Sequence, residues 1–244
     1  DYLGQCVQII PHITDEIKRR IKQCSYKSGA EIAIVEIGGT VGDIEGLPFL
    51  EAIRQMKLEE PMYNVVFVHV ALIPTLKTTG EQKTKPLQHS VNELRRIGIQ
   101  PDIIVARSEK PISPEVKKKI ALFGNVKEEF VFNSYDVENI YEVPLVLEKQ
   151  GMSDTLLRIL ALERREPDWS EWNSILSLAN SAKDTVKIAM IGKYSKLADS
   201  YVSINEALKH AGFHSRIKVQ PIFIEAEDIE RNEDETISKM LDSD

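Results

Sequence analysis

The sequence predicts an α/β fold in which helices cover a parallel sheet. Segments 31–36, 65–72 and 103–106 are short apolar runs rich in β-branched residues, as expected for buried strands. Between them, apolar residues recur at the three- or four-residue spacing of one helix face, as at Ile13, Ile17 and Ile21. Strands that alternate with helices are typical of βαβ units in a parallel sheet.

The C-terminal quarter predicts the start of a second α/β unit. The pattern changes near Glu163, and we interpret residues 164–184, with Pro167 and both tryptophans, as an interdomain connector. A strand over 185–191, a helix over 200–211 closed by Gly212 as its C-cap, and a strand over 217–224 interrupted by Pro221 then form one βαβ unit. The 60 residues from 185 onward are too few to complete such a domain.

Composition excludes several classes of protein. The net charge of −7 argues against a nucleic-acid partner, which usually selects a basic face. No apolar run approaches the roughly 20 residues that span a bilayer. Cys6 and Cys24 fit ordinary thiols of a reducing compartment, so we expect a soluble cytoplasmic protein that binds no membrane. Asp1 is not a Met and the last residues show no structural end, so we expect both ends to be cuts in a longer chain.

The segment Glu36–Glu45 (E-I-G-G-T-V-G-D-I-E) has the densest chemistry. Glu36 follows a predicted strand, and ligands of parallel sheets bind at the carboxyl ends of strands. A carboxylate there, followed by glycines, suits a Mg²⁺ held between protein and phosphates. Asp43 and Glu45 can accept hydrogen bonds from sugar hydroxyls or a base amino group. The alternative is a tight turn in which both acids favour the next helix N-terminus.

A second segment, Gly80–Ser90, places two lysines before a predicted helix. Pro86 suits the first turn of that helix, and Lys83 and Lys85 lie just before it. A helix N-terminus with free N–H donors and two ammonium groups suits a triphosphate, with Thr84 and Gln88 as neutral donors. The alternative is a solvated basic turn.

A third segment has three consecutive lysines, of which Lys119, beside an apolar run, is the candidate to face a site. Successive helical residues point about 100° apart, so at most two of the three can face one site, and a solubilising charge run is the alternative. The five histidines lack the spacing of metal ligands, and the chain has no G-x-x-x-x-G-K-[ST] loop.

Several long strings resemble the CTP synthase family, in order and at similar spacing. They are D-Y-L-G-x-x-V-Q-I-I-P-H-I-T-D-E-I-K, E-I-G-G-T-V-G-D-I-E, G-E-Q-K-T-K-P-x-Q-H-S-V-x-E-L-R and K-I-A-L-F-x-N-V. The resemblance extends from Asp1 to about Glu230. It implies a P-loop-like amidoligase domain of dethiobiotin-synthetase type over 1–163, a linker over 164–184, and the first βαβ unit of a class I glutamine amidotransferase domain over 185–244.

The resemblance also implies roles for individual residues. Glu36 matches the Mg²⁺-binding glutamate of the family, and Lys119 matches a lysine that contacts UTP and CTP. One stretch matches family residues that contact CTP alone: Asp43, Ile44 and Glu45. A second stretch matches residues that contact both UTP and CTP: Lys83, Thr84, Lys85, Pro86, Leu87 and Gln88. A third matches the segment that lines the adenine of ATP: Tyr135, Asp136 and Val137.

The implied activity is that of a ligase that forms a C–N bond. ATP phosphorylates O4 of UTP, and ammonia released from glutamine then displaces phosphate to give CTP, which inhibits as product. The resemblance further implies GTP as activator and a homotetramer. The family's P-loop would precede Asp1 and its glutaminase Cys, His and Glu would follow Asp244, so we expect no catalytic residue here and no activity from this segment alone.

The sequence departs from the family pattern at three positions and leaves two rival functions open. Leu87 stands where the family commonly has Thr, Gly124 where Cys is frequent, and Tyr135 where Lys is frequent. The first departure puts a secondary nucleotide contact in doubt, and the last puts the side-chain contact to adenine in doubt. The rivals are an ATP-dependent amidoligase acting on a carboxylic acid and a non-catalytic nucleotide-sensing module.

Overall fold

The computed structural model describes residues 4, 6–195, 197–231 and 233–244 and divides the chain into two compact units, Asp1–Arg165 and Glu166–Asp244. Within the described residues, no helix is both long and apolar enough to cross a membrane. Each unit contains parallel strands and helices, which confirms the predicted mixed α/β class.

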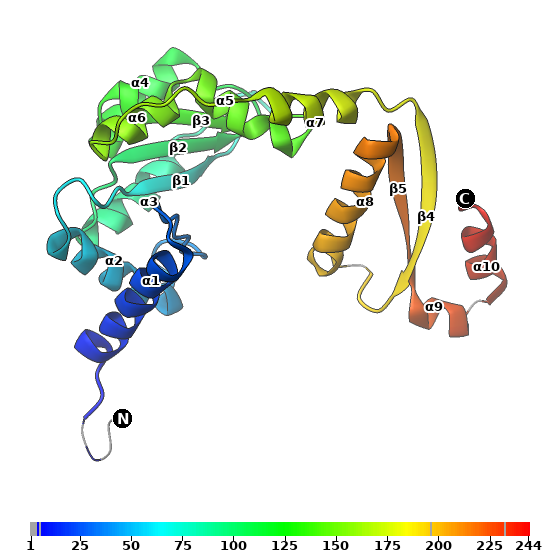
Figure 1. The fold of residues 1–244 in the computed structure, drawn as a ribbon, viewed down its shortest axis with the longest axis horizontal. Helices are drawn as coiled ribbons and strands as arrows, with labels where there is room; N and C mark the ends of the chain where they lie inside the picture. The colour runs from blue at the N-terminus through cyan, green and yellow to red at the C-terminus, as the bar shows by residue number, and fades with distance from the viewer. Residues whose placement is uncertain (1–3, 5, 196, 232) are drawn as a thin grey trace. The chain divides into compact units, whose positions relative to one another are not determined.

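The first unit is built on a three-stranded parallel sheet in the order β1-β2-β3 (Figure 1). The strands are β1 (Val68–Ile73), β2 (Ile103–Ser108) and β3 (Val131–Tyr135). Val68 pairs with Ile103, and Ile104 pairs with Val131, so the carboxyl ends of all three strands lie at one edge of the sheet. The sequence predicted β1 and β2 but gave no indication of β3.

Helices cover both faces of this sheet. The helices α3 (Lys85–Arg96) and α4 (Pro114–Gly124) pack on one face, where Leu87, Val91 and Ile120 join a core that is closed to solvent. The helices α5 (Val143–Lys149) and α6 (Met152–Ile159) cover Val105 and Phe132 on the other face. Short helical turns, η3 (Glu128–Phe130) and η4 (Ile140–Glu142), precede β3 and α5.

The N-terminal part of this unit contains two further helices. A π-helical turn, η1 (Ile9–Ile13), leads into α1 (Thr14–Ser28), and η2 (Ile44–Gly46) leads into α2 (Leu47–Glu59). The two long helices are joined by the ion pair Lys18–Glu59, with Nζ 2.5 Å from Oε1. Leu50 of α2 packs with Leu94 and Ile99, which links α2 to the end of α3.

The predicted strand over residues 31–36 is wrong. The structure gives this segment no regular secondary structure, and its side chains are exposed, Ile34 to 95%. A strand needs the backbone groups of a neighbour, and among the described residues no strand pairs with this one. Glu36 therefore does not lie at the end of a buried strand.

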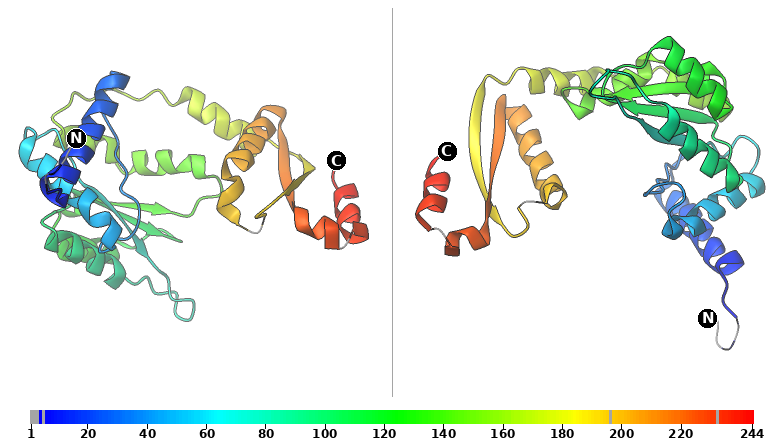
Figure 2. Two further views of the ribbon diagram at one scale, coloured as in Figure 1. Left: turned by 90° about the horizontal axis from the view of Figure 1, so that it is seen from below. Right: turned by 180° about the vertical axis from the view of Figure 1, so that it is seen from behind.

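The second unit is a two-stranded parallel sheet with helices beside it (Figures 1 and 2). Its elements are α7 (Ser170–Asn180), β4 (Asp184–Gly192), η5 (Ala198–Tyr201), α8 (Val202–Ser215), β5 (Ile217–Glu225), α9 (Ala226–Arg231) and α10 (Glu233–Leu241). The helix α7 lies within the segment interpreted as a connector. Pro221 does not interrupt β5, where it pairs with Ile188.

The predicted C-cap at Gly212 is also wrong. The helix α8 continues to Ser215, and Arg216 ends it in the left-handed conformation with φ 56°. Gly212 is buried inside the helix, and a Cβ there would lie 2.6 Å from the carbonyl oxygen of Ile217. Close packing of α8 on β5, rather than helix termination, therefore explains this glycine.

Candidate functional site

A pocket of about 490 Å³ opens where the loops after β1 and β2 meet. One wall comes from the loop between β1 and α3, and the other comes from the loop between β2 and the first turns of α4. Both loops follow the carboxyl ends of parallel strands, where ligands of α/β sheets bind. The lining residues are Thr75, Gly80, Glu81, Gln82, Thr84, Lys110, Pro111, Ile112, Ser113, Glu115, Val116 and Lys119.

The first wall ends at the N-terminus of α3. Pro86 occupies the first turn of this helix, as predicted. Thr84 is buried at 4% exposure, and its hydroxyl accepts a hydrogen bond from Gln88 Nε2 at 2.9 Å. The first-turn amides of a helix have no intrahelical acceptor, so the backbone of Lys85 and Leu87 presents donors near this wall.

The predicted lysines differ in whether they line the pocket. Lys119 lines the pocket together with Thr84, although 35 residues separate them, which supports the interpretation that Lys119 faces a site. Lys83 adjoins the pocket wall and forms an ion pair with Glu81, with Nζ 2.6 Å from Oε2. Lys85 is exposed at the start of α3 and does not line the pocket. The neighbouring Lys118 is also exposed and does not line it.

The charges on the pocket lining are balanced. The lining contains two lysines, Lys110 and Lys119, and two glutamates, Glu81 and Glu115. Hydrogen bonds from its own backbone amide and from Ser113 hold the pKa of Glu115 below its ordinary value, so this carboxylate is ionised at neutral pH. An excess of positive charge for a polyphosphate therefore depends on Lys83, Lys85 and the α3 N-terminus rather than on the lining alone.

One polar atom of the pocket wall lacks a protein partner. The hydroxyl oxygen of Thr75 is buried and forms no hydrogen bond in the structure. Buried polar atoms in native proteins are nearly always satisfied by protein groups or ordered water. The Thr75 hydroxyl is therefore a hydrogen-bonding group that this wall offers to water or to a polar ligand.

Leu87 cannot contact a nucleotide through its side chain. The side chain is fully buried in the core between α3 and the sheet, with Ile73 and Val91. Where the family commonly has Thr, this chain thus places an apolar core residue. Only the backbone amide of Leu87 is available to a ligand at the start of α3.

The segment Tyr135–Val137 follows β3 at the same edge of the sheet. Asp136 is held there by an ion pair with Arg107 at the end of β2, with Nη2 2.5 Å from Oδ1. Its backbone amide also donates to the carbonyl oxygen of Ser108 at 3.1 Å. None of the three residues lines the pocket, so an adenine site here would be a neighbouring one.

The acidic segment does not join the pocket. Neither Glu36 nor the stretch Asp43–Glu45 is among the residues that line it. The carboxylate of Asp43 accepts a hydrogen bond from the Thr40 amide at 2.8 Å, and Asp43 precedes η2. This geometry fits the alternative in which Asp43 closes a turn before a helix. Ile44 is 82% exposed beside it.

A magnesium site in this segment would rest on one carboxylate. Among the residues that the structure describes, no three His, Cys, Asp or Glu side chains gather in a way that would hold a metal. Glu36 is exposed, and its carboxylate has no hydrogen-bond partner among the described residues. Mg²⁺ commonly binds one or two carboxylates together with water and substrate phosphates, so a single free carboxylate fits that mode.

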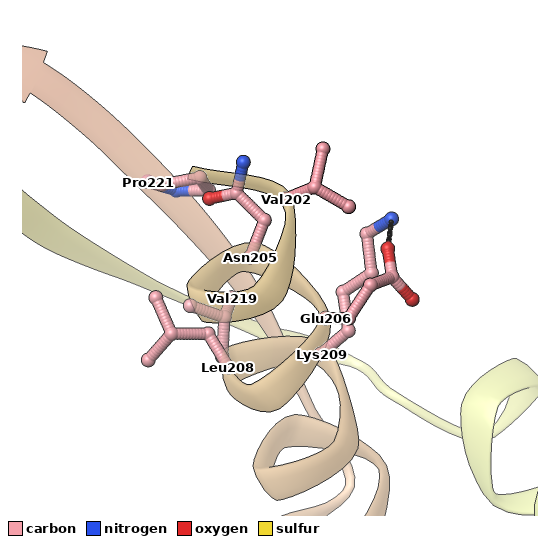
Figure 3. Close-up of a pocket in the computed structure, with 7 residues that line it drawn as sticks. All are labelled: Val202, Asn205, Glu206, Leu208, Lys209, Val219 and Pro221. Atoms are coloured by element: carbon pink, nitrogen blue, oxygen red, sulfur yellow. Dashed lines mark hydrogen bonds and ion pairs between the residues drawn. The ribbon is translucent and has the colours of Figure 1, made fainter. Parts of the chain in front are cut away.

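A second pocket, of about 250 Å³, lies in the second unit between α8 and β5 (Figure 3). Val202, Leu208, Val219 and Pro221 make it largely apolar, and the ion pair Glu206–Lys209 lies at its side with a distance of 2.6 Å. The side-chain oxygen of Asn205 is buried there and has no hydrogen-bond partner within the described part of the chain. No residue singled out as a candidate site residue by the sequence lines this pocket, so it is not the candidate site.

Sequence reasoning missed much of the main pocket. Thr75, Gln82, Lys110 and Glu115 line it, yet none was singled out. Gln82 lies inside the quoted G-E-Q-K-T-K-P string, but only the lysines that follow it suggested chemistry. Thr75 and Lys110 belong to no pattern, since they meet only when the ends of β1 and β2 are brought together.

The fold and the pocket together define an α/β protein with a candidate ligand site at the carboxyl ends of parallel strands. Residues 1–162 match the family model described as CTP synthase N-terminus, and the chain belongs to this family.

Individual relatives agree with this assignment. The chain is 61% identical over 239 residues to a CTP synthase of Sulfurisphaera tokodaii, which covers 98% of this chain and 45% of the relative. It is 59% identical over 231 residues to a CTP synthase of Aeropyrum pernix, covering 95% and 43%. A third CTP synthase, of Pyrobaculum calidifontis, is 55% identical over 234 residues, covering 96% and 44%. The chain therefore spans less than half the length of the curated relatives it matches.

Proposed function

We propose that this chain is part of a CTP synthase, an ATP-dependent ligase that converts UTP to CTP with ammonia from glutamine. The observation that carries the proposal is the match of residues 1–162 to the CTP synthase N-terminal family, supported by relatives of that name at 55–61% identity. Relatives named as CTP synthases favour UTP, rather than a carboxylic acid, as the acceptor.

The chemistry assigned to this chain is the activation of UTP. O4 of UTP attacks the γ-phosphorus of ATP, the bond to the bridging oxygen breaks, and ADP leaves. Ammonia then forms a bond to C4, and phosphate leaves with the O4 oxygen. The first step requires positioning and charge neutralisation more than covalent help from the protein.

The residues around the main pocket supply that neutralisation. We assign the UTP triphosphate to Lys83, Lys85 and Lys119, with further hydrogen bonds from Thr84, Gln88 and the backbone amide of Leu87. Pro86 has no amide N–H to donate, and its part is to fix the first turn of α3 beside the phosphates. CTP would share these phosphate contacts and place its base near Asp43, Ile44 and Glu45. Adenine would lie near Tyr135, Asp136 and Val137. Glu36 would hold a Mg²⁺ that neutralises phosphate charge during transfer.

The proposal extends to the organisation of the whole enzyme. Residues 1–163 would form part of a dethiobiotin-synthetase-like amidoligase domain, 164–184 a linker, and 185–244 the start of a glutamine amidotransferase domain. GTP would activate the enzyme, a homotetramer would be its assembled form, and it would work in the cytoplasm.

The shared triphosphate site is tested with lysine variants of the full-length enzyme. Lys83→Ala and Lys119→Ala remove charge-assisted hydrogen bonds, so each should raise both the KM for UTP and the inhibition constant for CTP by about tenfold or more. Lys118→Ala is the matched control, since Lys118 is exposed on the same helix outside the pocket. A variant that weakens UTP but leaves CTP inhibition unchanged would disprove the shared site.

The metal role is tested separately. Glu36→Ala in the full-length enzyme should abolish CTP formation, with either glutamine or free ammonia as nitrogen donor, while basal glutamine hydrolysis continues. Glu31→Ala serves as control, because Glu31 is an exposed acid five residues before Glu36. Normal CTP formation by Glu36→Ala at saturating Mg²⁺ would refute the metal role without affecting the family assignment.

A further inference from the structure

Gln82 joins the two walls of the main pocket. It lies in the loop between β1 and α3, directly before Lys83. Its side-chain amide donates hydrogen bonds across the pocket to the carbonyl oxygens of Lys110 at 2.9 Å and Pro111 at 3.3 Å. These carbonyls belong to the loop between β2 and α4. Among the residues that the structure describes, no other side-chain hydrogen bond links these two loops.

The backbone of Gln82 is itself fixed against the end of β1. Gln82 forms an isolated antiparallel bridge with Thr75. The amide of Lys83 donates to the carbonyl oxygen of Pro74 at 2.9 Å, and the amide of Leu76 donates to that of Glu81 at 2.9 Å. Any shift of Gln82 is therefore passed directly to Lys83.

The opposite end of the tether is anchored in the core. The Lys110 carbonyl also accepts a hydrogen bond from the Ser108 hydroxyl at 2.7 Å, and that hydroxyl accepts one from Asn133 Nδ2 at 2.8 Å. Asn133 Oδ1 in turn accepts from the amide of Ile112 at 2.9 Å. Ser108 and Asn133 are buried on β2 and β3. The loop before α4 is thus held by a buried polar network that leaves it little freedom.

We propose that Gln82 is a positioning residue for polyphosphate binding, which sets the separation between Lys83 and Lys119. The inference rests on the proposed function, because it takes the pocket as the triphosphate site. Lys119 lies on α4, which begins at Pro114, three residues after the tethered carbonyl of Pro111. Losing the tether removes no charge. The internally bonded segment 74–83, which carries Lys83, can then move against the anchored loop before α4, so the two lysines contact the phosphates together less well.

The decisive variant is Gln82→Met in the full-length enzyme. Methionine has a similar length and no charge, but it cannot donate a hydrogen bond. Gln100→Met is the matched control. Gln100 also joins two segments through its side-chain amide, which donates to the carbonyl oxygen of Gly124 at 3.1 Å at the opposite end of α4, and to that of the adjacent Pro101 at 3.0 Å.

Binding is measured as the dissociation constant of UTP, by calorimetry with Mg²⁺ and without ATP. Gln82→Met should raise it about tenfold, because Lys83 and Lys119 are no longer held at the separation that the phosphates need, and Gln100→Met should leave it within about twofold of the wild type. In a Lys119→Ala background the further effect of Gln82→Met should fall below about threefold, because the lysine that it positions is gone. A purely structural role would not produce this coupling.

The outcomes separate this inference from the function on which it rests. If Lys119→Ala leaves UTP binding unchanged, the triphosphate site itself is wrong. If Lys119→Ala weakens binding while folded Gln82→Met does not, or if the effect of Gln82→Met is equally large without Lys119, the positioning role is wrong. Melting temperatures verify folding, and Gln82→Asn, whose shorter amide cannot span the same distance, replaces the Met variant if that protein does not fold.

Discussion

Gly124 offers a quantitative test of how α4 packs on the sheet. A Cβ built on Gly124 would lie 2.3 Å from Cδ1 of Ile104, a side chain with no exposed surface. Favourable carbon contacts lie at about 3.5–4.0 Å, so this overlap exceeds about 1 Å. Gly124→Ala should therefore cost about 1–3 kcal/mol of overpacking, offset by at most about 1 kcal/mol of helix propensity. We expect a net loss of about 1–2 kcal/mol.

The double variant makes the prediction specific. Ile104→Val removes the Cδ1 atom that a new methyl group would meet, and alone it should cost about 0.5–1.5 kcal/mol. When Gly124→Ala is added to Ile104→Val, the new methyl group fills the vacated space, so the combined cost should be about 1 kcal/mol or more below the sum of the single costs. Stability is measured by hydrogen exchange of the β2 amides, because Trp169 and Trp172 both lie in the second unit and their fluorescence would not report on this contact.

Additive costs, or a stabilising Gly124→Ala, would refute this reasoning. Either result would mean that α4 moves away from β2 to accept the methyl group instead of clashing with Ile104. A moved α4 would also shift Lys119, so the UTP affinity of Gly124→Ala distinguishes a rigid helix from one that slides.

Three further predictions concern the core, an ion pair and the pocket. Leu87→Thr, which restores the residue common in the family, should destabilise the protein by about 2–4 kcal/mol in urea unfolding, because Leu87 is fully buried among apolar residues. Hydrogen bonds from Arg54 and then Gln55 lower the pKa of Glu51 to about 2, so its stabilising effect is present above pH 4.5 and is lost as the pH falls towards 2. Unfolding at about pH 7 and about pH 2 should therefore show Glu51→Gln costing about 1 kcal/mol at neutral pH and almost nothing at the acid pH, and an equal cost at both would contradict the assignment. Glu81→Gln frees Lys83 from its ion pair and removes a negative charge from the pocket lining, so UTP should bind about two- to fivefold more tightly by calorimetry.

Local sequence patterns predicted those helices and strands whose own residues show a clear apolar pattern. The helix predicted to begin near Pro86 is α3, and its Val91 and Leu94 are buried. The run 185–191 found β4, which extends by one residue at each end. Strand β3 was missed because Asn133 and Ser134 interrupt its apolar pattern, although Asn133 is buried and hydrogen-bonded through both side-chain polar atoms. No local pattern reveals that a polar residue has partners elsewhere.

The strand predicted at residues 31–36 is wrong for the opposite reason to the one that hid β3. The pattern there is that of a buried strand, but burial also requires a neighbouring strand and a covering layer, which the described residues do not supply. In the same way, β1 buries His69, Ala71 and Ile73 on one side and leaves Val70 and Leu72 about 60% exposed on the other. An apolar pattern indicates that a segment would be stable as a buried strand, but it does not show which neighbours bury it.

In the candidate site, too, residues were predicted where the nearby sequence is informative and missed where their partners lie far along the chain. Lys83 and Lys85 were proposed as site residues because a helix N-terminus has a recognisable sequence, with Pro86 in its first turn. Lys119 was favoured over the other two lysines by its apolar neighbours and by resemblance, and the pocket supports that choice. Gln82 could not have been found, because its partners are carbonyl oxygens 28 and 29 residues away.

The parallel register of the sheet would let these scattered residues serve the one reaction proposed above. The strands β1, β2 and β3 end at one edge, and the loops that follow them carry Lys83, the approach to Lys119, and Asp136 in turn. A donor and an acceptor nucleotide laid along that edge would meet adjacent loops. The triphosphate of UTP would lie over the ends of β1 and β2, and the adenine of ATP would lie beside β3. The Arg107–Asp136 ion pair joins the end of β2 to the segment after β3, and the Gln82 tether joins the loops after β1 and β2, so the sheet would set the spacing of the two proposed sites. Substitutions at the buried Asn133, which bonds the loop between β2 and α4, should therefore alter nucleotide binding without touching a nucleotide.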